Sequence, residues 1–362
     1  IVNMISSNYS HGGNIREVAK KYGFSPQQIL DFSANVNPWA SYFKVEDVLR
    51  SNLREIFWYP EPYCEKLTKK ISEYLKVDKE NILVGNGATQ LIYLIARSFT
   101  PRRALIVIPT FSEYERALRG VKTELKFLTL KEADNFSIDI QKIIKAAGGV
   151  EIIFICNPNN PTGSFLFKKE ILKLKQIAKE KRIILIIDES YIDFKYPEES
   201  LAREAVKDNH TLVLRSFTKF FAVAGLRLGY AVGRKDLIDK LRNLREPWMV
   251  NSLAQIAGIH LLKNSQYIEK IREAVDKERK FLFEKLFKIK GLKPYPPQAN
   301  FILIKIKGEL SSSDVQDALA KRGILVRDCS NFRGLTHKFI RVAVRSRKDN
   351  LKLIENLKEL IS

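Results

Sequence analysis

Short apolar runs alternate with longer amphipathic segments through the middle of the chain. The apolar runs span residues 104–108, 151–156, 183–187 and 211–214, and helix-like segments separate them. Runs of this length without regular polar alternation are typical of strands that are buried on both faces of a mostly parallel sheet. The pattern therefore predicts an α/β fold in which helices cover both faces of that sheet.

The chain before this alternation predicts smaller elements. One short helix is expected between two loops rich in glycine, serine and asparagine, at residues 10–15 and 31–38, and two helices at about residues 44–54 and 63–75. Residues 81–90 predict a short strand, a tight glycine-containing turn and the start of a helix. Such a turn directs backbone N–H groups and the positive end of the helix toward an anion.

Beyond residue 233 the pattern becomes strongly helical and then changes to a smaller α+β part. Helices are expected at about residues 235–245, 251–263 and 265–288. They are followed by strands at residues 300–305, 324–327 and 339–344, a helix near 313–321 and a closing helix from residue 348. We therefore expect a large domain at residues 41–245 and, at residues 246–362, a long linking helix with a small C-terminal domain.

Composition and charge narrow the class of protein. With 362 residues, 45% of them hydrophobic and 28% charged, the chain is expected to be globular. The net charge of +21 favours anionic ligands, but basic and acidic residues are mixed in amphipathic segments, so solvated helix faces are expected instead of a nucleic-acid-binding arm.

Targeting and metal-binding signals are missing from the sequence pattern. Cys64, Cys156 and Cys329 lack the paired spacing of a zinc site, so idle thiols in a reducing compartment are expected. Residues 1–10 do not resemble a signal peptide, and no apolar run reaches the roughly 18 residues of a membrane helix. We expect a cytoplasmic protein with no metal site and neither nucleic-acid nor membrane partners.

Polar residues follow the carboxyl ends of the four apolar runs. Carboxyl ends of parallel strands meet at one edge of a sheet, where ligands bind in α/β proteins. We therefore expect these polar residues to lie together. In chain order, the stretches are Pro109-Thr110-Phe111, Asn157-Pro158-Asn159-Asn160-Pro161-Thr162-Gly163, Asp188-Glu189-Ser190-Tyr191 and Ser216-Phe217-Thr218-Lys219.

Lys219 is the candidate reactive group. It follows a run that predicts a buried strand, and a lysine in a partly dry site loses affinity for its proton and can act as a nucleophile. Ser216, Thr218 and Arg227 could hold the phosphate of a cofactor whose aldehyde has condensed with that amine. An ordinary loop with a solvated lysine is the alternative.

Asp188 ends an apolar run, where an unpaired carboxylate would be costly to bury. A cationic ring nitrogen would be a suitable partner, Tyr191 and Asn160 could hydrogen-bond a neighbouring phenolate oxygen, and Phe111 could stack on the ring. The alternatives are a helix cap or a surface salt bridge for Asp188 and core packing for Phe111.

Two arginines and one histidine are candidate anion ligands. Arg327 and Arg341 lie on or beside short predicted strands, and Arg341 alternates with apolar Val342 and Val344, which places it on the opposite face. Arginines so placed suit bidentate recognition of a carboxylate or phosphate, with solvent exposure as the alternative. His11, in a glycine-rich loop, could bind an anion or simply finish a turn.

With these residues assembled, the whole chain resembles the fold-type I, pyridoxal-phosphate-dependent aminotransferase superfamily. The resemblance implies a large domain with a mostly parallel, seven-stranded sheet between helices, a small α+β C-terminal domain, and a homodimer with shared active sites. The cofactor would be pyridoxal 5'-phosphate. The motifs that match in order and spacing are Asn160-Pro161-Thr162-Gly163, Asp188-Glu189-Ser190-Tyr191, Ser216-Phe217-Thr218-Lys219 and Gly225-Leu226-Arg227-Leu228-Gly229.

The resemblance also implies roles for single residues. Lys219 would bind the cofactor covalently and Asp188 would pair with its ring nitrogen. Tyr191 and Asn160 would contact the ring oxygen, and Phe111 would stack on the ring. The other expected cofactor-binding residues are Gly87, Ala88, Thr89, Ser216, Thr218 and Arg227, together with Tyr59 from the partner subunit.

The residue at position 88 departs from the family pattern. Relatives often carry a polar or acidic residue there, whereas this chain has Ala88. The change removes a side-chain contact to the cofactor phosphate and leaves the backbone donors in place.

Four further stretches, at residues 11–17, 31–38, 247–251 and 327–335, are most similar to the threonine-phosphate decarboxylases of cobalamin biosynthesis. The histidinol-phosphate aminotransferases come next. In those decarboxylases an N-terminal histidine and paired glycines close over a phosphorylated substrate, so residues 1–40 are expected to form an arm over the active site. The implied substrate contacts are His11, Gly12, Asn35, Asn160, Arg327 and Arg341.

The implied reaction is decarboxylation of L-threonine O-3-phosphate to (R)-1-aminopropan-2-yl phosphate. The alternative is amino transfer between histidinol phosphate and 2-oxoglutarate. The bond at the substrate Cα that lies perpendicular to the cofactor ring breaks most readily, so the orientation of the substrate selects the reaction. A protein that binds anions or nucleic acid on an inactive enzyme scaffold is a third possibility, against which the intact Lys219 and Asp188 argue.

Overall fold

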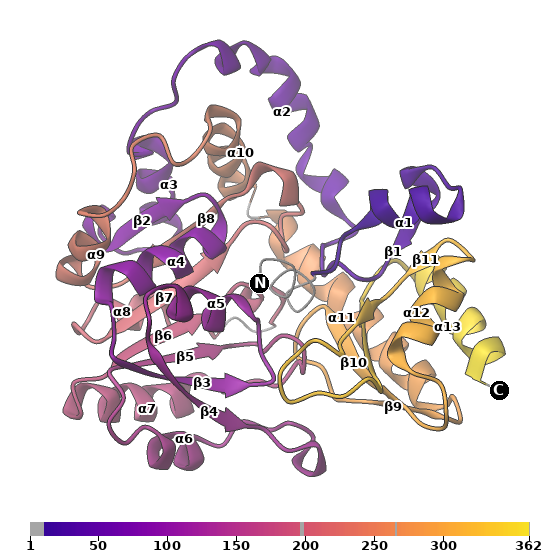
Figure 1. The fold of residues 1–362 in the computed structure, drawn as a ribbon. Coiled ribbons are helices and arrows are strands. Elements are labelled where there is room, and N and C mark those ends of the chain that lie inside the picture. The colour runs from indigo at the N-terminus through magenta and orange to yellow at the C-terminus, as the bar shows by residue number, and fades with distance from the viewer. Residues whose placement is uncertain (1–10, 196–198, 265, 362) are drawn as a thin grey trace.

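Two main β-sheets, one of seven strands and one of four, divide the molecule, and a two-stranded sheet accompanies the smaller one. In this computed structural model, residues 11–195, 199–264 and 266–361 are described. The first ten residues of the expected N-terminal arm lie outside this range. The expectation that residues 1–10 are not a signal peptide therefore also concerns residues outside it. Figure 1 shows the larger sheet with its helices on one side, helix α11 in the middle and the smaller sheet with the C-terminal helices on the other side.

The larger sheet has seven strands in the order β2-β8-β7-β6-β5-β3-β4. Strand β8 runs antiparallel to both of its neighbours, and every other neighbouring pair is parallel. The expectation of a mostly parallel, seven-stranded sheet is therefore confirmed. The strands are β2 (Ile82–Gly85), β3 (Arg103–Ile108), β4 (Glu124–Thr129), β5 (Ile152–Cys156), β6 (Ile184–Asp188), β7 (Thr211–Ser216) and β8 (Gly229–Val232).

Both faces of this sheet are buried, because alternate residues of each central strand enter two different cores. In β3, Leu105 and Val107 pack in one core, whereas Ala104, Ile106 and Ile108 pack in the other. The first core includes helices α3 (Glu65–Leu75), α6 (Ile140–Ala146), α7 (Lys168–Glu180), α8 (Ala202–Ala205), α10 (Ser252–Lys263) and α11 (Gln266–Phe287). The second includes α4 (Gly87–Phe99), α5 (Glu113–Gly120) and α9 (Lys235–Arg242).

The smaller sheet is antiparallel, with strand order β12-β13-β10-β9. Its apolar core includes residues of α11 and the two C-terminal helices, and also Phe32 from the N-terminal segment. The elements are β9 (Leu292–Pro294), β10 (Phe301–Ile306), α12 (Ser312–Ala320), β12 (Arg327–Asp328), β13 (Phe339–Ala343) and α13 (Arg347–Ile361).

The N-terminal segment is built into this smaller part. Strand β1 (Leu30–Asp31) pairs in parallel with β11 (Ile324–Leu325), and α1 (Ile15–Tyr22) precedes it. The strand predicted at residues 324–327 is therefore wrong as a single element, because β11 and β12 join different sheets. The helix predicted at residues 44–54 is α2 (Val45–Ser51) followed by a 3₁₀ turn at Leu53–Phe57.

The sequence pattern missed strands β4 and β8 of the larger sheet, and the short strands β1 and β9 as well. Strand β4 is a partly exposed edge strand with charged residues, and β8 has four residues, so neither produces a long apolar run.

The domain boundaries expected after residues 40 and 245 stay predictions. Within the described ranges, none of the helices is long and apolar enough to cross a membrane.

A buried ionic network anchors the strand that leads to Lys219. Arg215 on β7 is 1% exposed; its Nη2 donates to Asp193 Oδ1, its Nη1 donates to Ser200 Oγ at 2.9 Å, and Glu189 Oε2 lies 3.6 Å from Nη1. Arg272 on α11 donates to the Asp193 carbonyl at 2.8 Å. These contacts connect β7, the segment after β6 and α11.

We expect Arg215→Met to lower the free energy of unfolding by about 3–5 kcal/mol, because it removes the buried cation that faces Asp193 and Glu189. Urea denaturation of the purified protein measures the loss. The matched control is Arg102→Met, which breaks an ion pair with Glu151 at a side chain that is 90% exposed, and it should change stability by less than about 0.5 kcal/mol. Equal effects of the two substitutions would contradict the prediction.

Candidate active site

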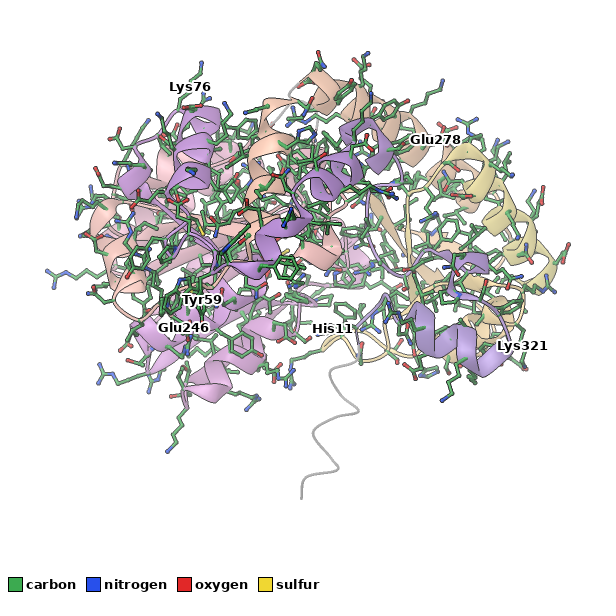
Figure 2. The ribbon with its side chains drawn as sticks, turned by 90° about the horizontal axis from the view of Figure 1, so that it is seen from above. His11, Tyr59, Lys76, Glu246, Glu278 and Lys321 are labelled. Atoms are coloured by element: carbon green, nitrogen blue, oxygen red, sulfur yellow. The ribbon has the colours of Figure 1, made fainter. Side chains whose placement is uncertain are left out.

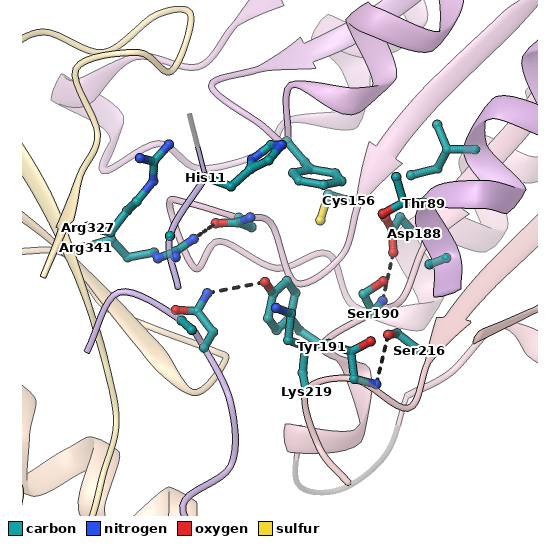
Figure 3. Close-up of a pocket in the computed structure, with 18 of the residues that line it drawn as sticks. His11, Thr89, Cys156, Asp188, Ser190, Tyr191, Ser216, Lys219, Arg327 and Arg341 are labelled. Atoms are coloured by element: carbon teal, nitrogen blue, oxygen red, sulfur yellow. Dashed lines mark hydrogen bonds between the residues drawn. The ribbon is translucent and has the colours of Figure 1, made fainter. Parts of the chain in front are cut away.

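A cavity of about 230 Å³ opens at the carboxyl ends of the parallel strands, next to the smaller sheet. Figure 3 shows Arg327 and Arg341 on one side of it and Thr89, Asp188 and Ser216 on the other. Most of the predicted site residues line this cavity. They are His11, Gly12, Asn35, Ala88, Thr89, Phe111, Asn160, Asp188, Tyr191, Ser216, Thr218, Lys219, Arg227, Arg327 and Arg341.

Two predicted site residues do not line the cavity. Gly87 has a φ of +76°, and a Cβ there would lie 2.7 Å from Arg227 Nη2, so glycine lets the guanidinium approach the start of α4. Tyr59 is 83% exposed and its ring centroid lies 5.0 Å from that of Trp248. Figure 2 shows Tyr59 well apart from His11. Its expected contact with the cofactor of a partner subunit stays a prediction.

Some cavity residues were not predicted from the sequence. Tyr114 is the most consequential, because its hydroxyl donates to Asp188 Oδ2 at 2.6 Å. No local signal in the sequence indicates this contact, because Tyr114 lies on α5 and Asp188 ends β6. The ring of Tyr114 also packs against that of Phe111, with centroids 5.8 Å apart. The cavity residues that we did not predict are Ser33, Ala34, Ile92, Tyr114, Cys156, Ser190 and Phe332.

Asp188 is the last residue of β6 and is 3% exposed. Its carboxylate accepts hydrogen bonds from two neutral groups, the hydroxyl of Tyr114 and the backbone N–H of Ser190 at 2.9 Å. Burial raises the pKa of Asp188, although the hydrogen bonds from Ser190 and Tyr114 oppose the rise. A cationic ligand at this end of the cavity would offset the cost of burying the carboxylate.

Lys219 lies in the loop after β7, and the N-terminal segment holds that loop in place. The backbone N–H of Asn37 donates to the Lys219 carbonyl at 2.9 Å, and Asn37 Nδ2 donates to the Phe220 carbonyl at 2.7 Å. Burial, followed by the charges of Arg341 and Arg227, lowers the pKa of Lys219 to about 8. The neutral, nucleophilic form of the amine is therefore more populated near neutral pH than it is in an ordinary solvated lysine.

The start of α4 forms an anion site at one end of the cavity. Ala88 and Thr89 lie in the first turn of the helix, where backbone N–H groups have no partner within the helix. Arg227 adds a positive charge beside them, and Ser216 and Thr218 add hydroxyls. Since the donors of the first turn are backbone groups, alanine at position 88 leaves them unchanged.

Arg327 and Arg341 occupy directly opposed positions on β12 and β13. They are 7% and 5% exposed, so the alternative of solvent-exposed arginines is wrong. Arg341 donates from Nη1 to Asn160 Oδ1 and from Nη2 to the Ser33 carbonyl at 2.6 Å, while Arg327 Nη2 donates to Asn331 Oδ1 at 2.8 Å. Two buried neighbouring cations favour an anionic ligand.

Tyr191 and Asn35 lie between the two ends of the cavity. Asn35 Nδ2 donates to the Tyr191 hydroxyl at 3.3 Å, and burial raises the pKa of Tyr191 to about 12. Within the described part of the chain, Asn35 Oδ1 and Arg341 Nε are buried without a hydrogen-bond partner. Buried polar groups without partners are costly, so both atoms are suited to a bound ligand.

A second, polar cavity of about 150 Å³ adjoins the first. Gln316 and Asn331 add side-chain amides to its wall. Arg327 therefore faces two compartments, one that it shares with Lys219 and one that is smaller and polar. The residues common to both cavities are His11, Gly12, Ser33 and Arg327.

Comparison with known proteins identifies the family. Residues 27–357 match the family model of the class I and II aminotransferases. The chain belongs to this family. A threonine-phosphate decarboxylase of Salmonella typhimurium is 38% identical, with 98% of this chain and 97% of the relative covered. A histidinol-phosphate aminotransferase of Methanococcus aeolicus is 32% identical, with 98% and 96% covered.

A solved structure agrees with the fold. The histidinol-phosphate aminotransferase from Clostridium acetobutylicum superposes with a TM-score of 0.84 at 33% identity, covering 92% of this chain and 99% of that chain. The fold-type I architecture expected from the sequence is therefore confirmed.

Among residues 11–195, 199–264 and 266–361, no group of three or more His, Cys, Asp or Glu could hold a metal ion.

The cofactor of this family is pyridoxal 5'-phosphate, and the cavity fits it. Lys219 offers an amine for its aldehyde, Asp188 offers a buried carboxylate for its ring nitrogen, and the start of α4 with Arg227 offers an anion site for its phosphate. When bound, the cofactor supplies a ring that accepts electrons from a bond broken at the substrate Cα.

We expect Lys219→Ala to abolish the visible absorbance of protein-bound cofactor that borohydride quenches in the unaltered protein. The reason is that the substitution removes the only atom of residue 219 able to bond to the aldehyde. Absorption spectra of protein reconstituted with pyridoxal phosphate provide the measurement. Lys207→Ala is the control, because Lys207 is 63% exposed and pairs with Glu204 on the surface. An unchanged spectrum of the Lys219→Ala protein would refute the assignment.

Proposed function

We propose that this protein decarboxylates L-threonine O-3-phosphate to (R)-1-aminopropan-2-yl phosphate, a reaction of cobalamin biosynthesis. The observation that carries the proposal is the pair of buried arginines, Arg327 and Arg341, which lie opposite each other at the end of the cavity away from Asp188. The substrate carries two anionic groups, a carboxylate and a phosphate, and thus needs two cationic contacts.

The surroundings of the arginines favour one distribution of these groups. Arg341 lies next to Asn160 and Ser33 in the cavity that contains Lys219, so we assign the substrate carboxylate to Arg341. Arg327 also faces the smaller polar cavity, together with His11, and we assign the phosphate to these two residues. Asn35 Oδ1 has no partner within the described residues and can only accept a hydrogen bond, so we assign it to the substrate amine, which can donate one.

Each residue near the cofactor would then have its own role in the reaction. Asp188 would keep the ring nitrogen protonated, while Tyr191 and Asn160 would hydrogen-bond the ring oxygen and Phe111 would stack on the ring. Lys219, with its lowered pKa, would return a proton to the substrate Cα after carbon dioxide has left. Arg341, which Asn160 and the Ser33 carbonyl hold in place, would bind the substrate carboxylate and so orient the bond at Cα that breaks.

Amino transfer from histidinol phosphate to 2-oxoglutarate is the second candidate. The same two arginines could bind the two carboxylates of 2-oxoglutarate, and both the archaeal relative and the solved structure described above carry the name of that aminotransferase. The greater identity to the decarboxylase from Salmonella typhimurium supports the first candidate.

The two reactions are separated by their products. We expect the protein reconstituted with pyridoxal phosphate to release carbon dioxide from L-threonine O-3-phosphate, and to form little glutamate from 2-oxoglutarate when histidinol phosphate is the amino donor. Carbon dioxide capture and a coupled glutamate assay measure the two activities on one preparation. Rapid glutamate formation without carbon dioxide release would replace the first candidate by the second.

We further propose a homodimer with shared active sites. Exposed apolar side chains gather in residues 53–63 and near residues 244–248, which is more than scattered surface exposure explains. Burial of this face against a second copy would bring Tyr59 near the partner's cofactor site. The residues are Leu53, Ile56, Phe57, Trp58, Tyr59, Tyr63, Leu244 and Trp248.

We also propose a cytoplasmic location, which the three free cysteines support.

A charge in the centre of this apolar face should prevent dimer formation. We expect Phe57→Glu, at a side chain that is 76% exposed in the single chain, to sediment as a monomer with reduced activity, because an unpaired carboxylate is costly to bury in an interface. Phe287→Glu is the control, since Phe287 is 68% exposed at the end of α11. Analytical ultracentrifugation makes the comparison, and an unaltered protein that sediments as a monomer would refute the dimer.

A further inference from the structure

A buried carboxylate that the proposed reaction does not use lies behind His11. Glu113, the first residue of α5, is 4% exposed. Its Oε1 lies 3.0 Å from His11 Nε2, and its Oε2 accepts a hydrogen bond of 2.6 Å from the hydroxyl of Tyr93 on α4. The guanidinium of Arg116 lies 3.9 Å from Oε1. Glu113 therefore connects two helices of the larger part with the N-terminal segment.

Glu113 is suited to remain charged in this position. Burial alone would raise the pKa of Glu113, but the hydrogen bonds from His11 and Tyr93, together with the charges of His11 and Arg116, outweigh it, so the pKa lies below its usual value. An ionised carboxylate only accepts hydrogen bonds, so His11 must donate from Nε2. The remaining ring nitrogen of His11, Nδ1, is then the one that can contact a ligand.

The same contact fixes where His11 lies. The His11 side chain is 46% exposed and belongs to a glycine-containing loop, so it needs an anchor to stay over the cavity. The loop is held at a second point by Ser33, whose Oγ accepts from the Gly13 N–H at 2.8 Å. A Cβ at Gly12 would lie 2.4 Å from the Ser33 carbonyl oxygen, so the backbones approach too closely for a larger residue.

We propose that Glu113 is a positioning residue that holds His11 over the phosphate of the substrate, with Tyr93 fixing the carboxylate. The inference rests on the proposed function only in that the substrate is a phosphate monoester. For Nδ1 to donate to the phosphate while Nε2 donates to Glu113, the imidazole must carry both protons. His11 then separates two anions, the buried carboxylate and the phosphate, which would otherwise repel each other.

The position of His11 between two anions predicts how binding of the phosphorylated ligand differs among two single variants and the double variant. In His11→Ala the carboxylate of Glu113 would face the phosphate directly, so binding should weaken by about 100-fold relative to the unaltered protein, a loss within the range for unpaired buried charges. In Glu113→Gln the histidine loses its charged anchor, and binding should weaken about tenfold. The double variant should bind phosphate more tightly than His11→Ala alone, because the repelling carboxylate is gone.

Stopped-flow titration of the holoenzymes, read before turnover, tests this inference, and steady-state assays on the same preparations give kcat. L-threonine O-3-phosphate and L-threonine are added separately, and binding is measured from the visible absorbance of the cofactor. We expect Glu113→Gln to weaken binding of the phosphorylated ligand while the affinity for L-threonine and the kcat change less than about twofold. Glu115→Gln is the matched control, since Glu115 lies on the same helix and pairs with Arg333 and Arg119 but not with His11. It should leave the ratio of the two affinities unchanged.

The outcomes separate the inference from the proposed function. Failure to release carbon dioxide while Glu113→Gln still weakens phosphate binding would reject the reaction and retain the role of Glu113. If the affinity ratio is unchanged in Glu113→Gln, or if the effects of Glu113→Gln and His11→Ala simply add, Glu113 has no positioning role. Tighter binding in Glu113→Gln would also overturn the inference, because it would mean that the carboxylate holds His11 away from the ligand.

Discussion

The parallel pairing of β3, β5, β6 and β7 is the constraint on which the site depends. These strands are buried on both faces, so most of their residues are apolar, and their polar residues lie at or next to the strand ends. Parallel direction brings the carboxyl ends to a single edge. Asp188 ends β6 and Lys219 follows β7, so groups distant in the sequence share one cavity.

The buried carboxylate of Asp188 and the buried arginines of the smaller sheet lie at opposite ends of that cavity, whereas Arg227 lies beside the start of α4, at the Asp188 end. Asp188 lies at one end with neutral hydrogen-bond donors, and Arg327 and Arg341 lie at the other, supplied by the antiparallel sheet of the C-terminal part. The amine of Lys219 lies near enough to Arg341 and Arg227 for both to lower its pKa. A cationic ring beside Asp188, with anionic groups at the start of α4 and at the two arginines, would match this distribution of charge.

The N-terminal segment completes the cavity from a third direction. Strand β1 joins the C-terminal part through β11, whereas Asn37 binds the loop of Lys219. Between these two attachments lie Ser33 and Asn35, both of which line the cavity. A segment of this kind couples the position of the reactive lysine to that of the arginines, because one stretch of chain contacts both.

The sequence by itself determined the parallel sheet, the family, and the candidate residues Asp188 and Lys219, because apolar runs and closely spaced motifs are local features. It could not determine that residues 324–327 divide between two sheets, nor that Arg327 and Arg341 are buried, because short strands acquire their burial from partners far along the chain. The contacts of Tyr114 with Asp188 and of Glu113 with His11 were likewise decided by the tertiary structure, since each joins residues from separate elements through side-chain geometry that no local pattern encodes.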